Sequence, residues 1–312
     1  MRRPSGIDWD EDLAIPPGSK RTPGGSRDTE GEIRAEMTPE QYCQQKVATS
    51  GSTLYYSLLF LPPEERRAIT ALYAFCGEIE DAVNAATDPG VAQARLAWWR
   101  TELDAVFDGR PQHPAAQALA AVTQRYRITQ ARLSEIVDGR QMDLDYNRYP
   151  DFRTLEVYCR RVSGVAILSA EILGYSDPGA LDYAQALGIA LQLTTIIADI
   201  GEDARRNRIY VPLDELSRFG LSSDDLIALR EDERFERLMA HQVVRARGFY
   251  ERAIGLLPRA DRRAQRSGLV LAAIQRTLLE EISALRGRTL NRRVALTPLR
   301  RFWIAWKTWY FA

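Results

Sequence analysis

The 312-residue chain contains 42 lysine and arginine residues and 42 aspartate and glutamate residues, so its formal net charge is zero. A balanced charge gives no electrostatic reason to expect a nucleic-acid partner. Apolar residues make up 45% of the chain, which indicates a globular protein with a large core. The three cysteines, Cys43, Cys76 and Cys159, lie far apart in the sequence and form no paired motif. Their spacing argues against a disulfide framework and a zinc site, and it suits a reducing cytoplasm.

The first 36 residues are polar and rich in glycine, proline and charge, without the apolar stretch of a secretory signal. We therefore predict a disordered tail over residues 1–36. No apolar run further along reaches the roughly 20 residues that a membrane-spanning helix needs. The protein is accordingly expected in the cytoplasm, either soluble or peripheral at the inner membrane.

Helical patterns dominate from residue 37 onward, and alternating strand patterns are absent. Proline and capping residues mark several helix starts, for example Thr38-Pro39. The expected all-α architecture is one helical domain over residues 37–295, followed by a basic aromatic helix within residues 296–312. After a first helix that opens at Thr38, the expected helices cover residues 62–83, 91–107, 114–126, 129–138, 151–173, 181–201, 223–230, 232–257, 259–285 and 298–311.

A polar stripe runs along one of the most apolar of these helices. Gln192, Thr195, Asp199 and Asp203 recur at steps of three and four residues, which places them on one helix face. Unpaired carboxylates are costly to bury. The stripe is therefore expected to face a cavity, a cation or another polar helix.

The helix over residues 69–83 carries a second stripe. Tyr73, Glu80 and Asn84 lie on one face, with Asp81 beside them, near a helix C-terminus where the macrodipole disfavours negative charge. A cation should therefore compensate this acidic end.

Two such helices could face each other across a bundle and hold Mg²⁺, which prefers oxygen ligands and keeps positions for water and substrate phosphates. That arrangement points to diphosphate chemistry beside an apolar cavity that holds a hydrocarbon tail. A buried ion pair, for example between Asp199 and an arginine, explains the same spacing. A third acidic segment, which contains Asp138, Asp143 and Asp145, is best explained on its own as a solvated helix end.

Taken together, several segments resemble the squalene/phytoene synthase family, and most closely the bacterial presqualene diphosphate synthases of hopanoid pathways. The resemblance covers residues 38–312. It implies an isoprenoid synthase bundle with a central cavity, in which two Asp-rich motifs on facing helices hold Mg²⁺ for the head-to-head condensation of two farnesyl diphosphates. The segments that carry it are Ser50-Gly-Ser-Thr-Leu-Tyr-Tyr56, Leu59-Phe-Leu-Pro-Pro63, residues 68–76, residues 192–203, Arg208-Ile-Tyr-Val-Pro212 and residues 293–300.

The resemblance assigns roles to individual positions of this chain. It implies that metal is held by Glu80, Asp81 and Asn84 in the first motif and by Asp199, Glu202 and Asp203 in the second. It places Ser50, Ser52, Tyr73 and Thr195 at the prenyl diphosphate substrate. It gives catalytic positions to Tyr158, Gln192, Arg208 and Tyr210.

The chain departs from the family pattern at charged positions. The first motif, usually Asp-Asp-x-x-Asp, is Glu80-Asp-Ala-Val-Asn84 here, and Gly77 and Ala198 stand where arginines are usual. Thr195 replaces an asparagine, and Gln141 stands where a glutamate is common. Each lost charge-assisted diphosphate contact is worth roughly 1.5–3 kcal/mol. An arginine from elsewhere could compensate, and the candidates are Arg161, Arg205, Arg206 and Arg208.

After Glu281 the chain carries seven lysine or arginine residues and no acidic residue. The helix over residues 298–311 combines Trp303, Trp306 and Trp309 with basic side chains, a pattern typical of a helix at a membrane surface. Docking of the same tryptophans on the protein core is the alternative.

Two functions of different classes follow from these patterns. The first is a Mg²⁺-dependent prenyltransferase that makes presqualene diphosphate, with a related enzyme of another prenyl chain length as a variant. The second is a non-catalytic family member with degenerate metal motifs, which acts as a membrane-associated assembly or lipid-binding factor. No glycine-rich nicotinamide motif is present, so no bound nicotinamide cofactor is expected.

Overall fold

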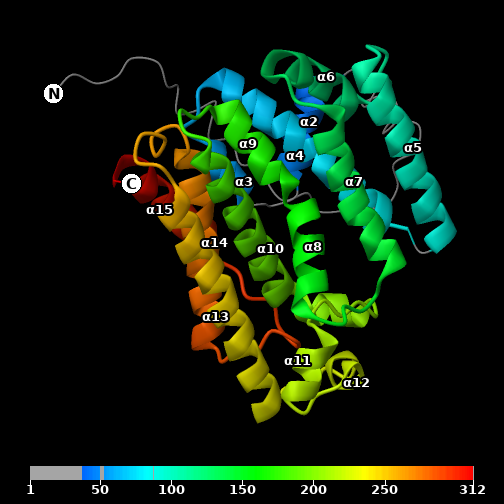
Figure 1. Ribbon diagram of the computed structural model, residues 1–312, viewed down its shortest axis with the longest axis vertical. Helices are drawn as coiled ribbons and strands as arrows, with labels where there is room; N and C mark the ends of the chain where they lie inside the picture. The colour runs from blue at the N-terminus through cyan, green and yellow to red at the C-terminus, as the bar shows by residue number, and fades with distance from the viewer. Residues whose placement is uncertain (1–36, 50–52, 87, 312) are drawn as a thin grey trace, which may run out of the picture. The chain divides into compact units, whose positions relative to one another are not determined.

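The computed structural model describes residues 37–49, 53–86 and 88–311. These residues form helices and no strand, with one isolated parallel bridge between Arg148 and Ile209 (Figure 1). The all-α prediction is confirmed. Residues Thr38–Ala312 form one compact unit that includes the C-terminal helix, whereas the predicted tail over residues 1–36 lies outside the described part. The helices are α2 (Pro39–Thr49), α3 (Leu54–Leu58), α4 (Pro63–Asn84), α5 (Pro89–Phe107), α6 (Pro114–Tyr126), α7 (Gln130–Asp145), α8 (Phe152–Val162), α9 (Gly164–Leu173), α10 (Gly179–Arg205), α11 (Leu213–Arg218), α12 (Ser223–Ile227), α13 (Glu233–Leu256), α14 (Arg266–Ala284) and α15 (Pro298–Phe311).

Three helix boundaries differ from the predictions. The helix predicted to stop at residue 138 continues as α7 to Asp145, because Gly139 packs against α8: a Cβ there would lie 2.8 Å from the backbone nitrogen of Val162. The helix predicted over residues 151–173 is divided at Ser163 into α8, which packs on α7, and α9, which packs on α4. The helix predicted to begin at residue 259 begins at Arg266.

Helix α10 is the central element of the bundle. It packs against α8, α9, α13 and α14, and most of its residues are buried (Figure 1). Its length and hydropathy would suit a membrane span, but protein covers 72% of its most apolar window, as expected for the core helix of a bundle. A second apolar core surrounds α4, and α9 lies against both α4 and α10.

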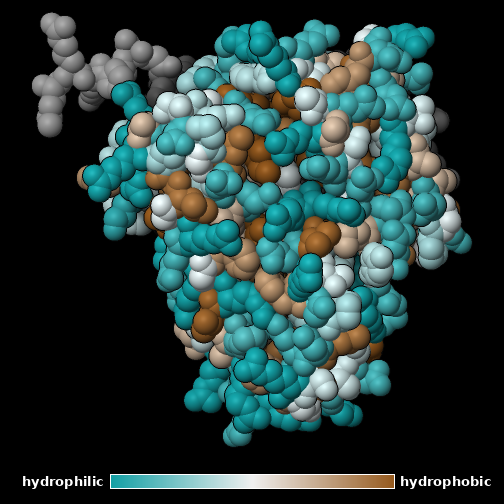
Figure 2. All heavy atoms as spheres, viewed as in Figure 1, coloured by the Kyte–Doolittle hydropathy of each residue, from teal (hydrophilic) through white to brown (hydrophobic). Residues whose placement is uncertain are grey.

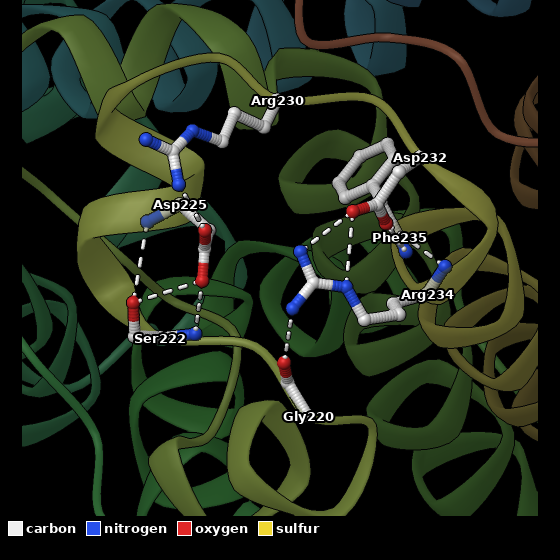
Figure 3. A network of polar contacts seen from close by, with 7 residues as sticks. All are labelled: Gly220, Ser222, Asp225, Arg230, Asp232, Arg234 and Phe235. Atoms are coloured by element: carbon white, nitrogen blue, oxygen red, sulfur yellow. Dashed lines mark hydrogen bonds and ion pairs between the residues drawn. The ribbon is translucent and has the colours of Figure 1, made fainter.

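The corner between α11 and α13 shows how this chain neutralises carboxylates for structural purposes (Figure 3). Asp225 closes a capping box with Ser222 at the start of α12 and pairs with Arg230 at 3.0 Å. Asp232 caps α13 and accepts two hydrogen bonds from Arg234, whose guanidinium also donates to the carbonyl of Gly220. These contacts satisfy the free backbone groups at two helix starts.

Polar side chains cover most of the face shown in Figure 2, and apolar side chains appear there only as small patches. The burial pattern is therefore that of an amphipathic bundle whose charged residues lie outside.

Candidate active site

Helices α4 and α10 carry a cavity wall and an acidic cluster in the same order along each chain segment. Ile69 and Tyr73 of α4 line a cavity together with Tyr183, Leu187 and Leu191 of α10. About two turns further on, both helices present acidic side chains. The apolar and the acidic parts of the predicted site are therefore contiguous on the same two helices.

The acidic residues of α10 are crowded and partly buried. Burial raises the pKa of Asp203 to about 7, and the neighbouring carboxylates of Asp199 and Asp143 add to the rise. Burial also raises the pKa of Asp199, with further contributions from Glu202 and from Glu80 of α4. The electrostatic coupling between Asp199 and Glu80 shows that the two acidic stripes face each other. Their excess negative charge gives this place an affinity for a cation.

The acidic residues of α4 are already paired with arginines. Glu80 lies 3.0 Å from the guanidinium of Arg140 on α7. The amide oxygen of Asn84 accepts a 2.5 Å hydrogen bond from Arg208, which follows α10 in the chain. Arg208 therefore connects the two predicted motifs directly.

A buried polar network holds these groups in place. Asp143, whose side chain is 2% exposed, accepts hydrogen bonds from Tyr210 at 2.6 Å and from Tyr158 at 3.2 Å. The same carboxylate lies 3.4 Å from Arg140, and the two tyrosine rings lie 5.2 Å apart. Burial alone would lower the pKa of Arg140, but the surrounding oxygen-bearing side chains outweigh this and raise it well above its ordinary value. Arg140 is therefore a permanent cation inside the site.

The segment after α14 adds a further cation. It lies so close to α10 that a Cβ on Gly201 would stand 2.2 Å from the carbonyl oxygen of Leu290. Arg205 fixes the segment by donating to the same carbonyl at 3.0 Å. This path brings Arg293 to within 3.8 Å of Asp199. Only a glycine at position 201 permits this approach.

Several predicted residues lie elsewhere. Asp81 pairs with Lys46 of α2 at 2.7 Å, so the structure does not bring it to the acidic cluster. The stem of Lys46 also covers Gly77, where a Cβ would meet it at 3.4 Å. Glu202 is exposed and pairs with Arg206.

Gln192 and Thr195 occupy the part of α10 between the cavity and the carboxylates, and the hydroxyl of Thr195 bonds to the carbonyl of Leu191. Tyr73 lines the cavity and contacts Ser169 of α9. Ser50 and Ser52 lie outside the described residues.

Of the four arginines considered as substitutes, only Arg208 reaches a residue of the first motif. Arg205 holds Leu290, Arg206 pairs with Glu202, and Arg161 lines a groove of about 510 Å³ formed by α7, α8 and the turn between them. The sequence reasoning missed Arg140 and Arg293. It also took the segment around Asp143 for a solvated helix end, which is wrong because Asp143 is buried. A usable signal was present: Arg140 and Asp143 are three residues apart and therefore share a helix face.

The cavity itself is narrow, with about 30 Å³ of space, enough for a single water molecule. Sites for small-molecule ligands usually measure some 300–1,000 Å³. The predicted central cavity is thus present as an apolar seam, and side chains along it must move before a prenyl chain can enter.

The donor set fits a divalent cation at α10 better than at α4. Asp199 and Asp203 lie one turn apart, and a pair of carboxylates completed by substrate phosphates and water is a usual Mg²⁺ environment. The candidate ligands of α4 are engaged by Arg140, Arg208 and Lys46. In the part of the chain that the structure describes, no three His, Cys, Asp or Glu side chains form a metal-binding group by themselves.

Comparisons with known proteins agree with this geometry. The squalene/phytoene synthase family model matches residues 47–300. The chain is 32% identical over 282 residues to a 15-cis-phytoene synthase of Synechocystis sp., covering 85% of this chain and 84% of that protein. It is 34% identical over 270 residues to the chloroplastic phytoene synthase of Narcissus pseudonarcissus, covering 83% of this chain and 63% of the relative.

Solved structures show the same fold. The squalene synthase HpnC from Alicyclobacillus acidocaldarius superposes with a TM-score of 0.70 at 26% identity, over 82% of this chain and 96% of that one. A dehydrosqualene synthase superposes with a TM-score of 0.77 at 23% identity, over 90% of this chain and 98% of that one.

Proposed function

Because this chain belongs to the squalene/phytoene synthase family, we propose that it condenses two farnesyl diphosphates head to head to presqualene diphosphate. Members of the family are prenyltransferases and typically depend on a divalent metal. The observation that carries the proposal is the contiguity of the apolar seam with two facing acidic stripes on α4 and α10. Such a site separates a hydrocarbon tail from its diphosphate head.

In this proposal Asp199 and Asp203 hold Mg²⁺. When bound, the ion supplies positive charge that stabilises the leaving diphosphate. The raised pKa values of these two residues support the assignment, because they report negative charge that the protein itself leaves incompletely neutralised.

Arg140, Arg208 and Arg293 bind diphosphate oxygens in this proposal. They approach the acidic cluster from α7, from the segment after α10 and from the segment after α14. Arginine suits this role because its planar fork makes two parallel hydrogen bonds to a phosphate. Two of the three, Arg140 and Arg293, lie outside the family's usual arginine positions, which are Gly77 and Ala198 in this chain. We therefore interpret them as replacements for the missing charges.

The chemistry that these residues support is ionisation followed by addition. The bond between carbon and the diphosphate oxygen breaks, and its electron pair leaves with diphosphate. The resulting allylic cation is attacked by the double bond of the second substrate, and loss of one proton closes the cyclopropane. The side chains of Tyr73, Leu187 and Leu191 exclude water, which would otherwise capture the cation.

Phytoene synthesis is the second candidate. Phytoene synthases of Synechocystis sp. and Narcissus pseudonarcissus are similar to this chain over most of its length. Phytoene is built from two 20-carbon units by the same head-to-head chemistry, so the acidic cluster serves both reactions equally. Chain length is decided along the apolar seam.

The non-catalytic alternative rests on the altered first motif. In the structure Glu80 and Asn84 are occupied by arginines, which compete with a metal ion for the same oxygens. A protein with this arrangement could bind a prenyl diphosphate without converting it.

Product analysis separates the three possibilities. The purified full chain is incubated with Mg²⁺ and either farnesyl diphosphate or its 20-carbon homologue, and the dephosphorylated products are identified by gas chromatography and mass spectrometry. Presqualene alcohol from the 15-carbon substrate supports the proposal. A 40-carbon product from the longer substrate alone supports phytoene synthesis. Substrate binding without any product supports the non-catalytic alternative.

A further inference from the structure

Helix α15 presents a row of large apolar side chains to solvent. Leu299 is 79% exposed, Trp303 58% and Tyr310 59%, and Phe302 is also exposed. Spacings of three, four and seven residues place these side chains on one side of the helix, together with Trp306. We call the set Leu299, Phe302, Trp303, Trp306 and Tyr310 the α15 outer face. An exposed apolar patch of this kind usually marks an interaction surface.

The other side of α15 already anchors the helix to the protein. Ala305 is fully buried, and the Trp309 ring lies 5.6 Å from Phe60. The helix packs against α14 and α3 through this side (Figure 1). The rings of the outer face contact mainly one another, with Trp303 stacked on Trp306 at 5.2 Å. Docking on the core therefore accounts for Trp309 but leaves the outer face without a covering element in the described chain.

Positive charge accompanies this face. Arg300, Arg301 and Lys307 lie on α15, and residues 282–312 contain no acidic side chain. Arg300 pairs with Glu281 of α14, while no ion pair joins Lys307 to any described residue. On a helical wheel, Lys307 and Arg300 border the apolar arc. Exposed tryptophan and tyrosine rings beside basic side chains suit the interface between lipid headgroups and acyl chains.

We propose that the α15 outer face binds the surface of an anionic lipid bilayer, with α15 lying in the plane of the interface. A second copy of this chain is a poorer occupant, because a two-fold contact would bring two copies of the same basic helix together. A bilayer that carries negative headgroups instead attracts each lysine or arginine near its surface by about 1 kcal/mol.

The position of α15 gives this contact a consequence that rests on the proposed function. The helices beneath it, α3 and α14, contribute Leu54, Ser57, Gly268 and Leu271 to the apolar seam. Binding through the outer face therefore places one wall of the seam next to lipid, into which a hydrocarbon product partitions.

The test is co-sedimentation of the full chain with vesicles, without substrate, so that its result does not depend on the proposed activity. We expect binding to vesicles that contain phosphatidylglycerol, weaker binding to pure phosphatidylcholine vesicles, and loss of binding at high salt. The triple substitution Leu299→Ser, Phe302→Ser and Trp303→Ser should weaken binding about 10–100-fold. Lys307→Glu should weaken it about 5–10-fold.

Matched controls are available elsewhere on the surface. Val244 on α13 is 63% exposed and Tyr175 is 40% exposed, so Val244→Ser and Tyr175→Ser remove exposed apolar groups outside α15. Arg110→Glu reverses a charge whose side chain is 82% exposed, between α5 and α6. None of these three variants should change binding.

Two results would overturn the proposal. One is wild-type protein that ignores anionic vesicles, or a triple variant that binds them as well as the wild type. The other is a concentration-dependent dimer in light scattering that the triple variant abolishes, because this outcome assigns the outer face to a second copy. If the triple variant fails to fold, as judged by circular dichroism, the single variant Trp303→Ser carries the test with an expected loss of about 5-fold.

Discussion

Two groups of aspartates in this protein are held in opposite ways. At the corner between α11 and α13, hydrogen bonds from Ser222 lower the pKa of Asp225, and hydrogen bonds from Arg234 lower the pKa of Asp232 (Figure 3). On α10, burial and neighbouring carboxylates raise the pKa values of Asp199 and Asp203. The first group is arranged to stabilise the charged form, and the second is arranged against it.

The difference indicates which carboxylates serve the fold and which serve a ligand. Capping and ion-pairing aspartates stabilise two helix starts. The α10 pair costs folding free energy at neutral pH and is explained by a cation that binds there later. Substitutions in the two groups should therefore move stability and activity in opposite directions.

The largest expected effect is on activity in the α10 group. Asp203→Asn should lower kcat/KM for product formation by about 10²–10³-fold, because one charged ligand of the proposed Mg²⁺ site is removed. Steady-state kinetics with farnesyl diphosphate measure this. The matched control is Asp225→Asn, which should retain wild-type kinetics while losing about 0.5–1 kcal/mol of stability through the capping box. Equal activity losses in both variants would erase the distinction between the groups.

Arginines that replace the family's missing charges should show the next largest effect. Arg293→Gln should weaken binding of inorganic diphosphate about 10-fold or more in calorimetry, since a charge-assisted contact is worth roughly 1.5–3 kcal/mol. Arg293 is 77% exposed, so its loss should leave the fold intact.

Arg140→Gln should weaken diphosphate binding by a similar factor and also reduce stability, because Glu80 and Asp143 lose their buried partner. Arg286, which pairs with Glu236 away from the cluster, provides the control through Arg286→Gln. Unchanged diphosphate affinity in both Arg293→Gln and Arg140→Gln would contradict the assignment of these residues.

The two groups also differ in their expected pH dependence. The folded-state pKa of Asp203, about 7, lies above its ordinary value of 3.8. Its contribution to stability is therefore fully present below pH 3.8 and is lost as the pH rises through 7. Asp203→Asn should consequently stabilise the metal-free protein by about 1–3 kcal/mol at pH 8 and have little effect near pH 4.

Asp225 should behave in the opposite sense. Its lowered pKa means that its stabilising contribution is present above the ordinary value and is lost as the pH falls below it. Denaturant unfolding of Asp203→Asn and Asp225→Asn at pH 4, 6 and 8 measures both trends. A destabilising effect of Asp203→Asn at pH 8 would show that this carboxylate serves the fold.

The smallest expected effect concerns the apolar seam. Leu191 lines it one turn from Thr195, and Leu191→Ala should increase the preference for a 20-carbon over a 15-carbon substrate about 3–10-fold. Competition between the two substrates in one reaction measures the ratio. Ile227→Ala, at a 39% exposed position outside the seam, should leave it unchanged.

The sequence predicted the helices and the facing stripes well because both depend on local periodicity. Glu80, Asn84, Asp199 and Asp203 follow from spacing, and the segment that contains Arg208 follows from the family resemblance. Asp81 could not be separated from Glu80 by sequence, since its direction is decided by Lys46, 35 residues away in the chain.

Arg140 and Arg293 were missed for a related reason. Both reach the site through packing that spacing does not reveal, one because α7 continues past Gly139 and the other because the backbone near Leu290 passes over Gly201. The narrowness of the seam is likewise a property of side-chain packing, and composition does not disclose it.

The central claim is that Asp199 and Asp203 give this site its Mg²⁺ dependence. Calorimetry with a non-ionisable thiodiphosphate analogue of farnesyl diphosphate, with and without Mg²⁺, tests it most directly. Mg²⁺ should tighten binding at least about 10-fold in wild-type protein and in Asp81→Asn, but not in Asp203→Asn. Binding of the wild-type protein that is indifferent to Mg²⁺, or a Mg²⁺ effect lost in Asp81→Asn and kept in Asp203→Asn, would contradict it.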